Sequence, residues 1–328
     1  MRRLIGHEWA LEFLENAIRR GDVSHSYLFT GPRGVGKRTL ALEFAKALCC
    51  RVSLPPCGHC RDCRDVAQGR HPDVKVLEPD NSSIKIEQIR ELQREAFLAP
   101  HRSPYRIFII ADTEKATPEA ANSLLKTLEE PPPHSIFILT ALSADLLLPT
   151  IVSRCQVLNL RPLPDDLIRE FLEKEWGIES SRASLLARIS EGCVGKAVEF
   201  LKEERTFRER TEDLEAFLRL IKSDTITRLE WAEAISKERE EERVQEMVKR
   251  WILALRDMLL LLEGMQDMVV NVDFKDELRA VATKLGKEKI RSGLKDLRFI
   301  LEALSRNANL RIVLDVLVLK LPGLVQEG

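Results

Sequence analysis

The sequence predicts an α/β domain followed by an all-helical region, and three observations indicate this fold class. Short apolar strand candidates alternate with amphipathic helix patterns as far as residue 160, and a glycine-rich turn joins the first strand to a helix. Beyond the segment RPLP at 161–164, no convincing strand appears. Strands that alternate with helices form a parallel sheet with helices on both faces. We therefore expect an α/β domain at 1–162, a small helical domain at 163–205 and a second helical domain at 206–328.

Each expected element of the first domain rests on a local pattern. The expected strands share a nearly continuous apolar run, typical of burial on both faces, and lie at 26–30, 105–111, 135–141 and 156–160. The expected helices share apolar residues spaced three or four apart, and lie at 7–20, behind the glycine-rich turn, at 84–98 and from residue 117. Thr117 is a suitable N-cap, Pro118 suits the first helical position, and the prolines at 131–133 end that last helix.

Composition and charge exclude several classes of protein. The chain has 328 residues, of which 44% are apolar and 31% charged, and its formal net charge is −1. A protein of this charge is not a basic nucleic-acid binder as a whole, so any such contact comes from a local patch. The amphipathic N-terminus is not a signal peptide, and no apolar run is long enough to span a membrane. We therefore expect a cytoplasmic protein with no membrane partner.

The stretch LFTGPRGVGK contains most of a phosphate-binding loop. Gly31, Gly34 and Gly36 provide the turn, and Lys37 stands where such a loop carries its phosphate-binding lysine. Backbone N–H groups in a turn of this kind, followed by a helix N-terminus, form a nest for anions. The expected strand before the loop and the expected helix after it supply the structural context that the motif requires.

The residues that would hold a metal ion beside this loop are altered. Arg38 replaces the hydroxyl residue that normally follows the lysine and holds Mg²⁺, and Thr39 comes one residue too late. Where the partner strand of such a loop normally ends in two adjacent acids, this chain has Ala111 and Asp112. Because two positions have changed independently, we expect ATP hydrolysis, and also ATP binding, to be weak or absent.

Five of the seven cysteines lie between residues 49 and 63, which favours a metal site over disulfides in a chain without a secretory signal. Four thiolates can close a tetrahedral structural Zn²⁺ site, and the spacing indicates a zinc knuckle at 50–63 with Cys50, Cys57, Cys60 and Cys63 as ligands. Cys49 or His59 is the alternative to Cys50 as the fourth ligand. An iron–sulfur cluster and a redox pair are the other chemistries open to these thiols.

Three segments together resemble the bacterial clamp-loader family of AAA+ proteins in their order and spacing, namely HSYLFTGPRGVGKRTLALEFAKAL, NSLLKTLEEPP and PTIVSRCQ. The resemblance covers nearly the whole chain. It implies an AAA+ P-loop domain, a helical lid and a helical collar through which subunits assemble. It also implies a five-subunit ring, with tau/gamma and delta subunits as neighbours, that opens the sliding clamp and places it on primed DNA. The family's cysteine just after the P-loop helix aligns with Cys50.

The resemblance also implies roles for single residues. Arg154 stands in the family's Ser-Arg-Cys triplet, where it would act as an arginine finger on a neighbour's ATP. An arginine that bridges to a carboxylate of its own chain is the structural alternative. Lys196 stands near the position of a nucleotide-sensing arginine, although a residue at the start of a helix fits it better, since lysine lacks the bidentate fork.

The same resemblance places Lys85, Arg90 and Arg94 on a helix that faces DNA in the ring. A solvated helix face is the alternative, because glutamates at 87, 91 and 95 interleave with these cations. We therefore expect a non-hydrolysing clamp-loader subunit. A tau/gamma-type motor ATPase is the enzymatic alternative, and a stand-alone zinc-dependent DNA-binding module is a third that the near-neutral charge disfavours.

Overall fold

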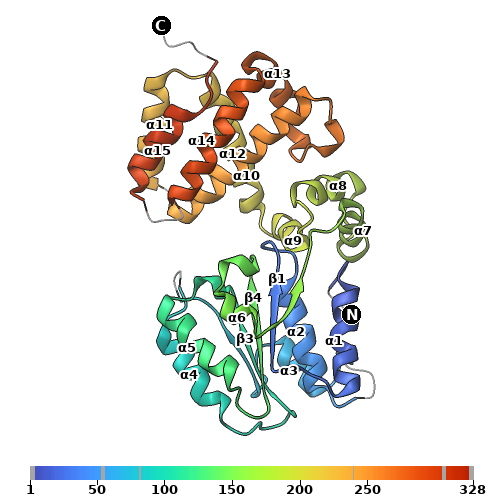
Figure 1. Cartoon of the computed structure of the whole chain (residues 1–328). Helices are drawn as coiled ribbons and strands as arrows, with labels where there is room; N and C mark the ends of the chain where they lie inside the picture. The colour runs from blue at the N-terminus through green and yellow to red at the C-terminus, as the bar shows by residue number, and fades with distance from the viewer. Residues whose placement is uncertain (1–3, 53–55, 81–82, 239, 305–307, 325–328) are drawn as a thin grey trace. The chain divides into compact units, whose positions relative to one another are not determined.

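The computed structural model describes residues 4–52, 56–80, 83–238, 240–304 and 308–324 (Figure 1). By its internal contacts the chain divides into two compact units. The first consists of Met1–Ile178 and Gly192–Lys196, and the second of Glu179–Glu191 and Ala197–Gly328.

A five-stranded parallel sheet in the order β2-β3-β4-β1-β5 forms the centre of the first unit. Its strands are β1 (Ser26–Thr30), β2 (Val74–Leu77), β3 (Arg106–Ile110), β4 (Ser135–Ala141) and β5 (Gln156–Asn159). Every residue of the three inner strands is buried, which explains their continuous apolar runs. The parallel sheet that the sequence predicts is therefore confirmed.

The two edge strands are where the sequence prediction was incomplete or wrong. The pattern gave no indication of β2, whose four residues VKVL are mostly half-buried and include Lys75. We expected a buried strand at 156–160, but only Leu158 of the four residues in β5 is buried. An edge strand has a neighbour on one side only, so it needs no continuous apolar run.

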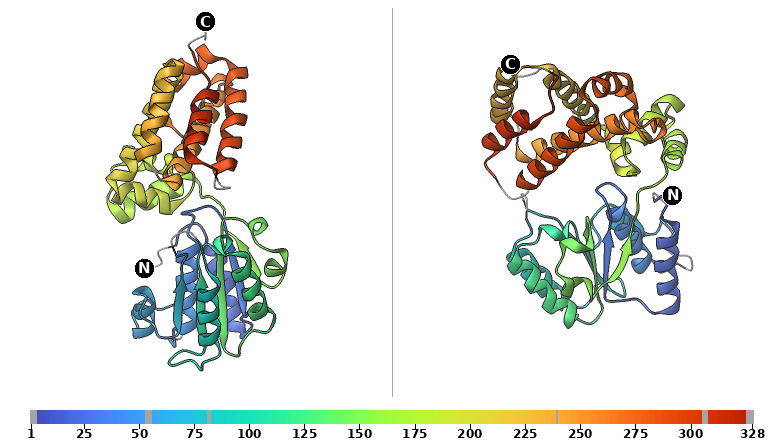
Figure 2. Two further views of the ribbon diagram at one scale, coloured as in Figure 1. Left: turned by 90° about the vertical axis from the view of Figure 1, so that its left-hand side faces the viewer. Right: turned by 45° about the horizontal axis from the view of Figure 1, so that its top comes forward.

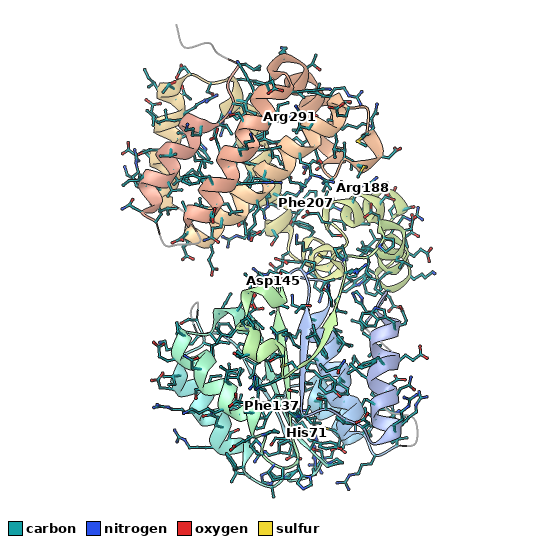
Figure 3. The ribbon with its side chains drawn as sticks, in the orientation of Figure 1. His71, Phe137, Asp145, Arg188, Phe207 and Arg291 are labelled. Carbon is teal, nitrogen blue, oxygen red and sulfur yellow. The ribbon has the colours of Figure 1, made fainter. Side chains whose placement is uncertain are left out.

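Helices cover both faces of this sheet, as expected for an AAA+ domain (Figure 1). One face packs against α1 (Glu8–Arg20), α2 (Lys37–Cys49) and α3 (Arg61–Ala67). The other packs against α4 (Ile86–Ala96), α5 (Pro118–Glu129) and the short α6 (Pro149–Val152). In the second layer the rings of Phe108 and Phe137 stack with their centroids 5.4 Å apart, and Figure 3 labels Phe137 in the sheet.

The ends of α5 follow the predicted capping pattern. The Thr117 side chain accepts a hydrogen bond from the Ala120 N–H at 3.2 Å, and Pro118 occupies the first turn. The helix ends at Glu129, shortly before the three prolines. Local sequence signals therefore fix the position of Glu129, which lies at the C-terminal end of the helix.

The second unit is all-helical, and among the described residues beyond 164 no strand forms (Figure 2). Its helices are α8 (Ser180–Ile189), α10 (Glu204–Lys222), α11 (Thr225–Glu238), α12 (Glu241–Leu262), α13 (Lys275–Leu285), α14 (Lys287–Leu304) and α15 (Leu310–Lys320). Trp251 is fully buried in the core and lies 5.7 Å from the Phe217 ring, centroid to centroid. Within the described ranges, no helix has the length and apolar character needed to cross a bilayer.

The lid region at 163–205 does not stand apart as a third compact unit. Its first helix, α7 (Asp165–Trp176), falls in the first unit and α8 in the second, while α9 (Val194–Lys202) begins in the first unit and continues into the second. The division into three domains at 162 and 205 stays a prediction.

Candidate functional site

The phosphate loop connects β1 to α2, and its glycines are required by backbone geometry. Gly31, Gly34 and Gly36 have φ values of 144°, 83° and 115°, a region that side-chain-bearing residues rarely adopt. A Cβ atom on Gly31 would lie 2.3 Å from the Leu160 carbonyl oxygen. Gly36 is the N-cap of α2, so the helix N-terminus begins directly at the loop. This is the arrangement that can cradle an anionic group.

Lys37 turns back onto the loop that precedes it. Its ammonium group donates hydrogen bonds to the carbonyl oxygens of Gly31 at 2.6 Å and Pro32 at 3.0 Å, and the residue is buried. Burial lowers the pKa of Lys37, and the nearby carboxylates of Glu114 and Asp112 oppose that shift. The two acids that follow β3 therefore act on the lysine electrostatically, a relation that the sequence did not reveal.

Neither altered position offers an oxygen ligand for a metal ion. The Arg38 guanidinium pairs with Glu78 at 2.6 Å on the surface, and Ala111 directly follows β3. Asp112 adopts a left-handed backbone with φ of 48° and lies 3.7 Å from the Lys115 ammonium. Burial raises the pKa of Glu114, whose buried Oε2 has no hydrogen-bond partner among the described residues. The acids of this segment, Asp112 and Glu114, therefore follow Ala111 in the chain and do not take its place.

The first turn of α9 lies directly on the phosphate loop. The Gly195 N–H donates to the Gly34 carbonyl oxygen at 2.7 Å. A Cβ atom on Gly195 would lie 2.9 Å from the Gly34 Cα, and one on Gly34 would lie 3.0 Å from the Lys196 nitrogen. Sequence reasoning singled out Lys196 and missed Gly195. The signal that could have revealed it is a glycine in the first turn of a helix, where close backbone approach is one of the few reasons for its presence.

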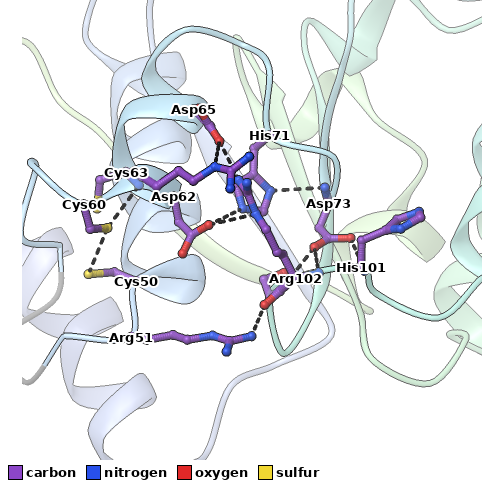
Figure 4. Close-up of polar contacts among 12 residues, drawn as sticks. Cys50, Arg51, Cys60, Asp62, Cys63, Asp65, His71, Asp73, His101 and Arg102 are labelled. Carbon is purple, nitrogen blue, oxygen red and sulfur yellow. Dashed lines mark hydrogen bonds and ion pairs between the residues drawn. The ribbon is translucent and has the colours of Figure 1, made fainter.

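Four cysteines converge beside the C-terminal end of α2, and Figure 4 shows three of them. The sulfur atoms of Cys50, Cys57, Cys60 and Cys63 lie within 4.8 Å of one another, with 3.9 Å between Cys57 and Cys63 and 4.0 Å between Cys50 and Cys60. A tetrahedral Zn²⁺ ion with Zn–S bonds of about 2.3 Å separates its sulfur ligands by about 3.8 Å. The four thiols therefore fit a structural zinc site.

Backbone N–H groups donate to two of these sulfurs, and the pKa of one thiol is lowered, whereas burial raises the pKa of the Cys60 and Cys63 thiols. The N–H of Cys60 donates to the Cys57 sulfur, and the N–H of Cys63 donates to the Cys60 sulfur, each at 3.3 Å. The Cys60 N–H is the main reason why the pKa of the Cys57 thiol is lowered to about 6. The turn between Cys57 and Cys60 needs Gly58, whose φ is 77°.

The alternative fourth ligands lie elsewhere. Cys49 is the last residue of α2 and is buried in the helix–sheet core, where burial raises the pKa of its thiol to about 12. His59 is exposed, and its Nδ1 lies 2.9 Å from the Cys57 carbonyl oxygen. The geometry therefore brings Cys50 into the group and leaves both Cys49 and His59 outside it.

Ion pairs join the cysteine segment to the loop before β3 (Figure 4). Asp62 and Asp65 on α3 pair with Arg102 at 3.1 and 2.6 Å, and Asp62 also lies 3.3 Å from Nε2 of the buried His71. Arg51 donates to the Arg102 carbonyl oxygen. These partners show that Arg102 supports the local structure.

Asp73 organises the same loop from the side of β2. Its carboxylate accepts backbone N–H bonds from His101, Arg102 and Ser103 at 2.6, 2.7 and 2.9 Å (Figure 4). Burial raises the pKa of Asp73, but these three donors outweigh burial and hold it below its ordinary value. Sequence reasoning missed Asp73, because an acid next to a proline in a loop has no distinguishing pattern.

Arg154 follows α6 and precedes β5. Its guanidinium pairs with Glu129 at 2.7 Å and donates to the Thr150 carbonyl oxygen at 2.9 Å. The Ser26 hydroxyl donates to the Arg154 carbonyl oxygen at 2.5 Å, which anchors the backbone to β1. The Arg154 side chain is 34% exposed. A carboxylate partner on the same chain, the structural alternative for this arginine, is therefore present in Glu129.

Comparison with known proteins decides the family. Residues 6–164 match the family model described as DNA polymerase III, delta subunit. The DNA polymerase III subunit delta' of Bacillus subtilis is 30% identical over 323 residues, which cover 97% of this chain and 95% of that protein. The chain belongs to the delta-prime family of bacterial clamp-loader subunits. This confirms the resemblance that the motifs indicated.

Other similar proteins either align with a smaller part of this chain or have a lower sequence identity. The DNA polymerase III subunit tau of Escherichia coli is 38% identical over 203 residues, which are 60% of this chain and 31% of that protein. The chain thus spans about a third of that tau protein. A DNA polymerase III gamma subunit-related protein of known structure from Thermotoga maritima matches 95% of this chain and 99% of its own, with 20% identity and a TM-score of 0.46.

The candidate DNA-facing residues of this delta-prime family member lie along α4. Lys85, Arg90 and Arg94 are all exposed, and among the described residues neither arginine lies within 4.0 Å of a carboxylate. Glu91 and Glu95 instead pair with Lys75 on β2 at 2.9 and 2.7 Å. Two of the three interleaved glutamates therefore have a basic partner of their own, which leaves the arginines less neutralised than the sequence implied.

Proposed function

We propose that this clamp-loader subunit does not hydrolyse ATP itself and instead supplies Arg154 in trans to the ATPase site of a neighbouring subunit. The first part of this proposal rests on the residues at the two positions that normally hold Mg²⁺. One carries Arg38, engaged with Glu78, and the other carries Ala111. Without these ligands Mg²⁺ is not held against the phosphates, and phosphoryl transfer loses its main electrostatic stabilisation.

The environment of Arg154 supports the second part. The side chain is partly exposed, it extends from a backbone anchored on β1, and the pair that it makes with Glu129 is a surface pair. A guanidinium can exchange a carboxylate for a phosphate, because both present the same pair of oxygens to its fork. An arginine finger that reaches a neighbour's γ-phosphate contributes about 10³–10⁵ in rate.

The test is Arg154→Ala in a ring reconstituted with tau/gamma and delta subunits, with ATP turnover measured in the presence of sliding clamp and primed DNA. We expect normal assembly and a loss of hydrolysis at one site, and we expect Arg154→Lys to recover little, because lysine lacks the fork. Arg19→Ala is the matched control. Arg19 is a surface arginine that pairs with a glutamate, as Arg154 does, although the partner of Arg19 lies on the same helix. Full turnover in an assembled Arg154→Ala ring would refute the finger.

Further parts of the proposal concern ligands and partners. We infer a structural Zn²⁺ ion at the four cysteines, and weak or absent nucleotide binding at the phosphate loop, where Lys37 and α9 already contact the loop backbone. Tau/gamma and delta subunits, the sliding clamp and primed DNA are the proposed partners, with DNA phosphates facing Lys85, Arg90 and Arg94. The three domains at 1–162, 163–205 and 206–328 are proposed to act as AAA+ domain, lid and collar.

A tau/gamma-type motor ATPase is the second candidate, and two observations favour it. Over its 203 aligned residues the chain is 38% identical to the tau subunit of Escherichia coli, more than its 30% identity to the delta' subunit of Bacillus subtilis. Glu114 and Asp112 also stand near Lys37, where acids can influence the loop. ATP turnover by the isolated chain with Mg²⁺ separates the two candidates, since only the motor hydrolyses ATP alone.

A further inference from the structure

The guanidinium of Arg154 is occupied by acceptors of its own chain. One terminal nitrogen pairs with Glu129 at 2.7 Å, and the other donates to the Thr150 carbonyl oxygen at 2.9 Å and to the Ser153 hydroxyl at 3.4 Å. The Ser153 hydroxyl in turn donates to the Thr150 carbonyl oxygen at 3.1 Å. Of these acceptors only Glu129 carries a charge, so it is the one that competes with a phosphate for this side chain.

The position of Glu129 favours this pairing for a reason of its own. Glu129 is the last residue of α5, where the unsatisfied carbonyl groups make the helix end partially negative. A carboxylate is disfavoured at such an end unless a cation lies beside it, and Arg154 is that cation. Glu129 lies on α5 and Arg154 lies in the turn after α6, and these two helices pack into one core through Leu124, Leu128 and Ile151.

We propose that Glu129 is a positioning residue that holds Arg154 on its own chain until a neighbour's phosphate displaces it. This inference rests on the proposed role of Arg154 as a finger. Carboxylate and phosphate bind the same guanidinium fork, so the finger reaches a neighbour's ATP only when the bond to Glu129 breaks. Glu129 thereby sets how readily the finger is released, and it takes no part in the chemistry itself.

The exposure of the pair limits the size of this effect. The Arg154 and Glu129 side chains are 34% and 47% exposed, and solvent-exposed ion pairs contribute little because water and salt screen them. We therefore expect release of the finger to change ATP turnover by about two- to five-fold, which is the range that such a surface pair supports. Such an effect is far smaller than the loss expected on removing Arg154.

The experiment uses Glu129→Gln in the reconstituted ring, which removes the charge and keeps the shape. Glu130→Gln is the matched control, because Glu130 is the adjacent residue, is exposed, and makes no ion pair among the described residues. We expect Glu129→Gln to raise turnover about two- to five-fold and Glu130→Gln to leave it unchanged. Both variants are also made in the Arg154→Ala background, where Glu129→Gln should have no effect.

The salt dependence of ATP turnover distinguishes the holding role of Glu129 from a purely structural role. Raising the salt concentration screens the pair, so the ratio of Glu129→Gln to unmodified turnover should approach one. Unchanged turnover in Glu129→Gln, beside a large loss in Arg154→Ala, would overturn the holding role and leave the finger intact. An equal loss from Glu129→Gln in both backgrounds, with a lower melting temperature, would assign Glu129 to the fold instead. Full turnover in Arg154→Ala would refute both proposals.

Discussion

Single glycines determine the shape of the phosphate loop, and their tolerance to substitution depends on what lies beside each one. Gly31 and Gly21 both have positive φ, but a Cβ atom on Gly31 would meet the Leu160 carbonyl oxygen, whereas one on Gly21 would meet nothing within 4 Å. A side chain at Gly31 would therefore meet a clash in addition to a backbone φ of 144°, whereas one at Gly21 would meet only the left-handed backbone with φ of 69°.

We expect Gly31→Ala to lower the free energy of unfolding by about 2–4 kcal/mol, since it combines an unfavourable φ with a backbone clash. Gly21→Ala is the control and should cost about 1–2 kcal/mol, from the left-handed backbone alone. Urea unfolding followed by circular dichroism measures both. Equal losses in the two variants would show that the loop relaxes away from Leu160.

Asp73 shows how one buried carboxylate makes stability depend on pH. Its folded pKa lies below the ordinary value because three backbone N–H groups outweigh the effect of burial. A carboxyl group with a lowered folded pKa stabilises the protein above its unfolded pKa, about 3.9, and this stabilisation is lost as the pH falls through the folded value.

Asp73→Asn should therefore reduce the free energy of unfolding by about 1.5–3 kcal/mol near neutral pH, because hydrogen bonds to a charged acceptor are weakened. The difference from the unmodified protein should stay constant from about pH 5 to pH 8 and shrink below about pH 4. Urea unfolding across this range tests it, with the exposed Asp22→Asn as control. A difference that persists undiminished at the lowest pH would contradict the charge-based explanation.

At the scale of elements, the cysteine segment is a small unit attached to the α/β domain. The helix α3 carries Cys63 together with Asp62 and Asp65, which pair with Arg102 in the loop before β3. Metal binding at the cysteines would therefore order α3 and, through these ion pairs, the adjoining loop. Of α3, only Val66 belongs to the core on that face of the sheet, and the rest of both cores comes from other elements, so we expect the inner strands to stay packed without the metal.

We expect elemental analysis to find about one zinc ion per chain. Cys57→Ser should lose the ion and Cys49→Ala should retain it, because Cys57 belongs to the four-sulfur group and Cys49 does not. Acid should release the ion as the thiolates take up protons. Hydrogen exchange after chelation should increase in α3 and leave β1, β3 and β4 protected. Zinc-free protein purified without chelators, or zinc lost from Cys49→Ala, would argue against this site.

For the whole molecule, the proposed loss of ATP hydrolysis and the proposed supply of an arginine finger concern the same domain. The phosphate loop keeps its glycine turn and helix N-terminus, and Arg38 and Ala111 occupy the positions that normally hold the metal. Arg154 lies in the turn between α6 and β5 of the same domain. Under the proposed function, the subunit contributes to the ring through a site that it completes in a neighbour.

The isolated chain should hydrolyse ATP at well below about 1 s⁻¹, the lower end of ordinary enzyme turnover. Ala111→Asp alone should not raise the rate, because Arg38 still blocks the second metal ligand. Arg38→Thr combined with Ala111→Asp tests whether both losses together account for the inactivity, with Lys37→Ala added as the inactive control. Turnover near 1 s⁻¹ by the unmodified chain would favour the motor alternative.

The sequence by itself determined several features that depend on near neighbours along the chain. The inner strands, the caps of α5, the phosphate loop and the cysteine spacing are all read from a few adjacent residues, because burial and capping follow local periodicity. The same reasoning could not find β2, whose strand character comes from pairing with β3, or the exposure of β5, which follows from its place at the edge.

Only the tertiary structure decided which distant residues meet. It brought Glu129 to Arg154, Gly195 to Gly34, and Cys50 into the sulfur group in place of its neighbour Cys49. No local pattern encodes these contacts, since each depends on where helices and loops come to lie after the sheet and its two cores have packed. The physical reason is that the spacing of residues along the chain fixes the face of a helix or strand on which each side chain lies. Which other residues that face contacts is fixed only by the packing of the elements against one another.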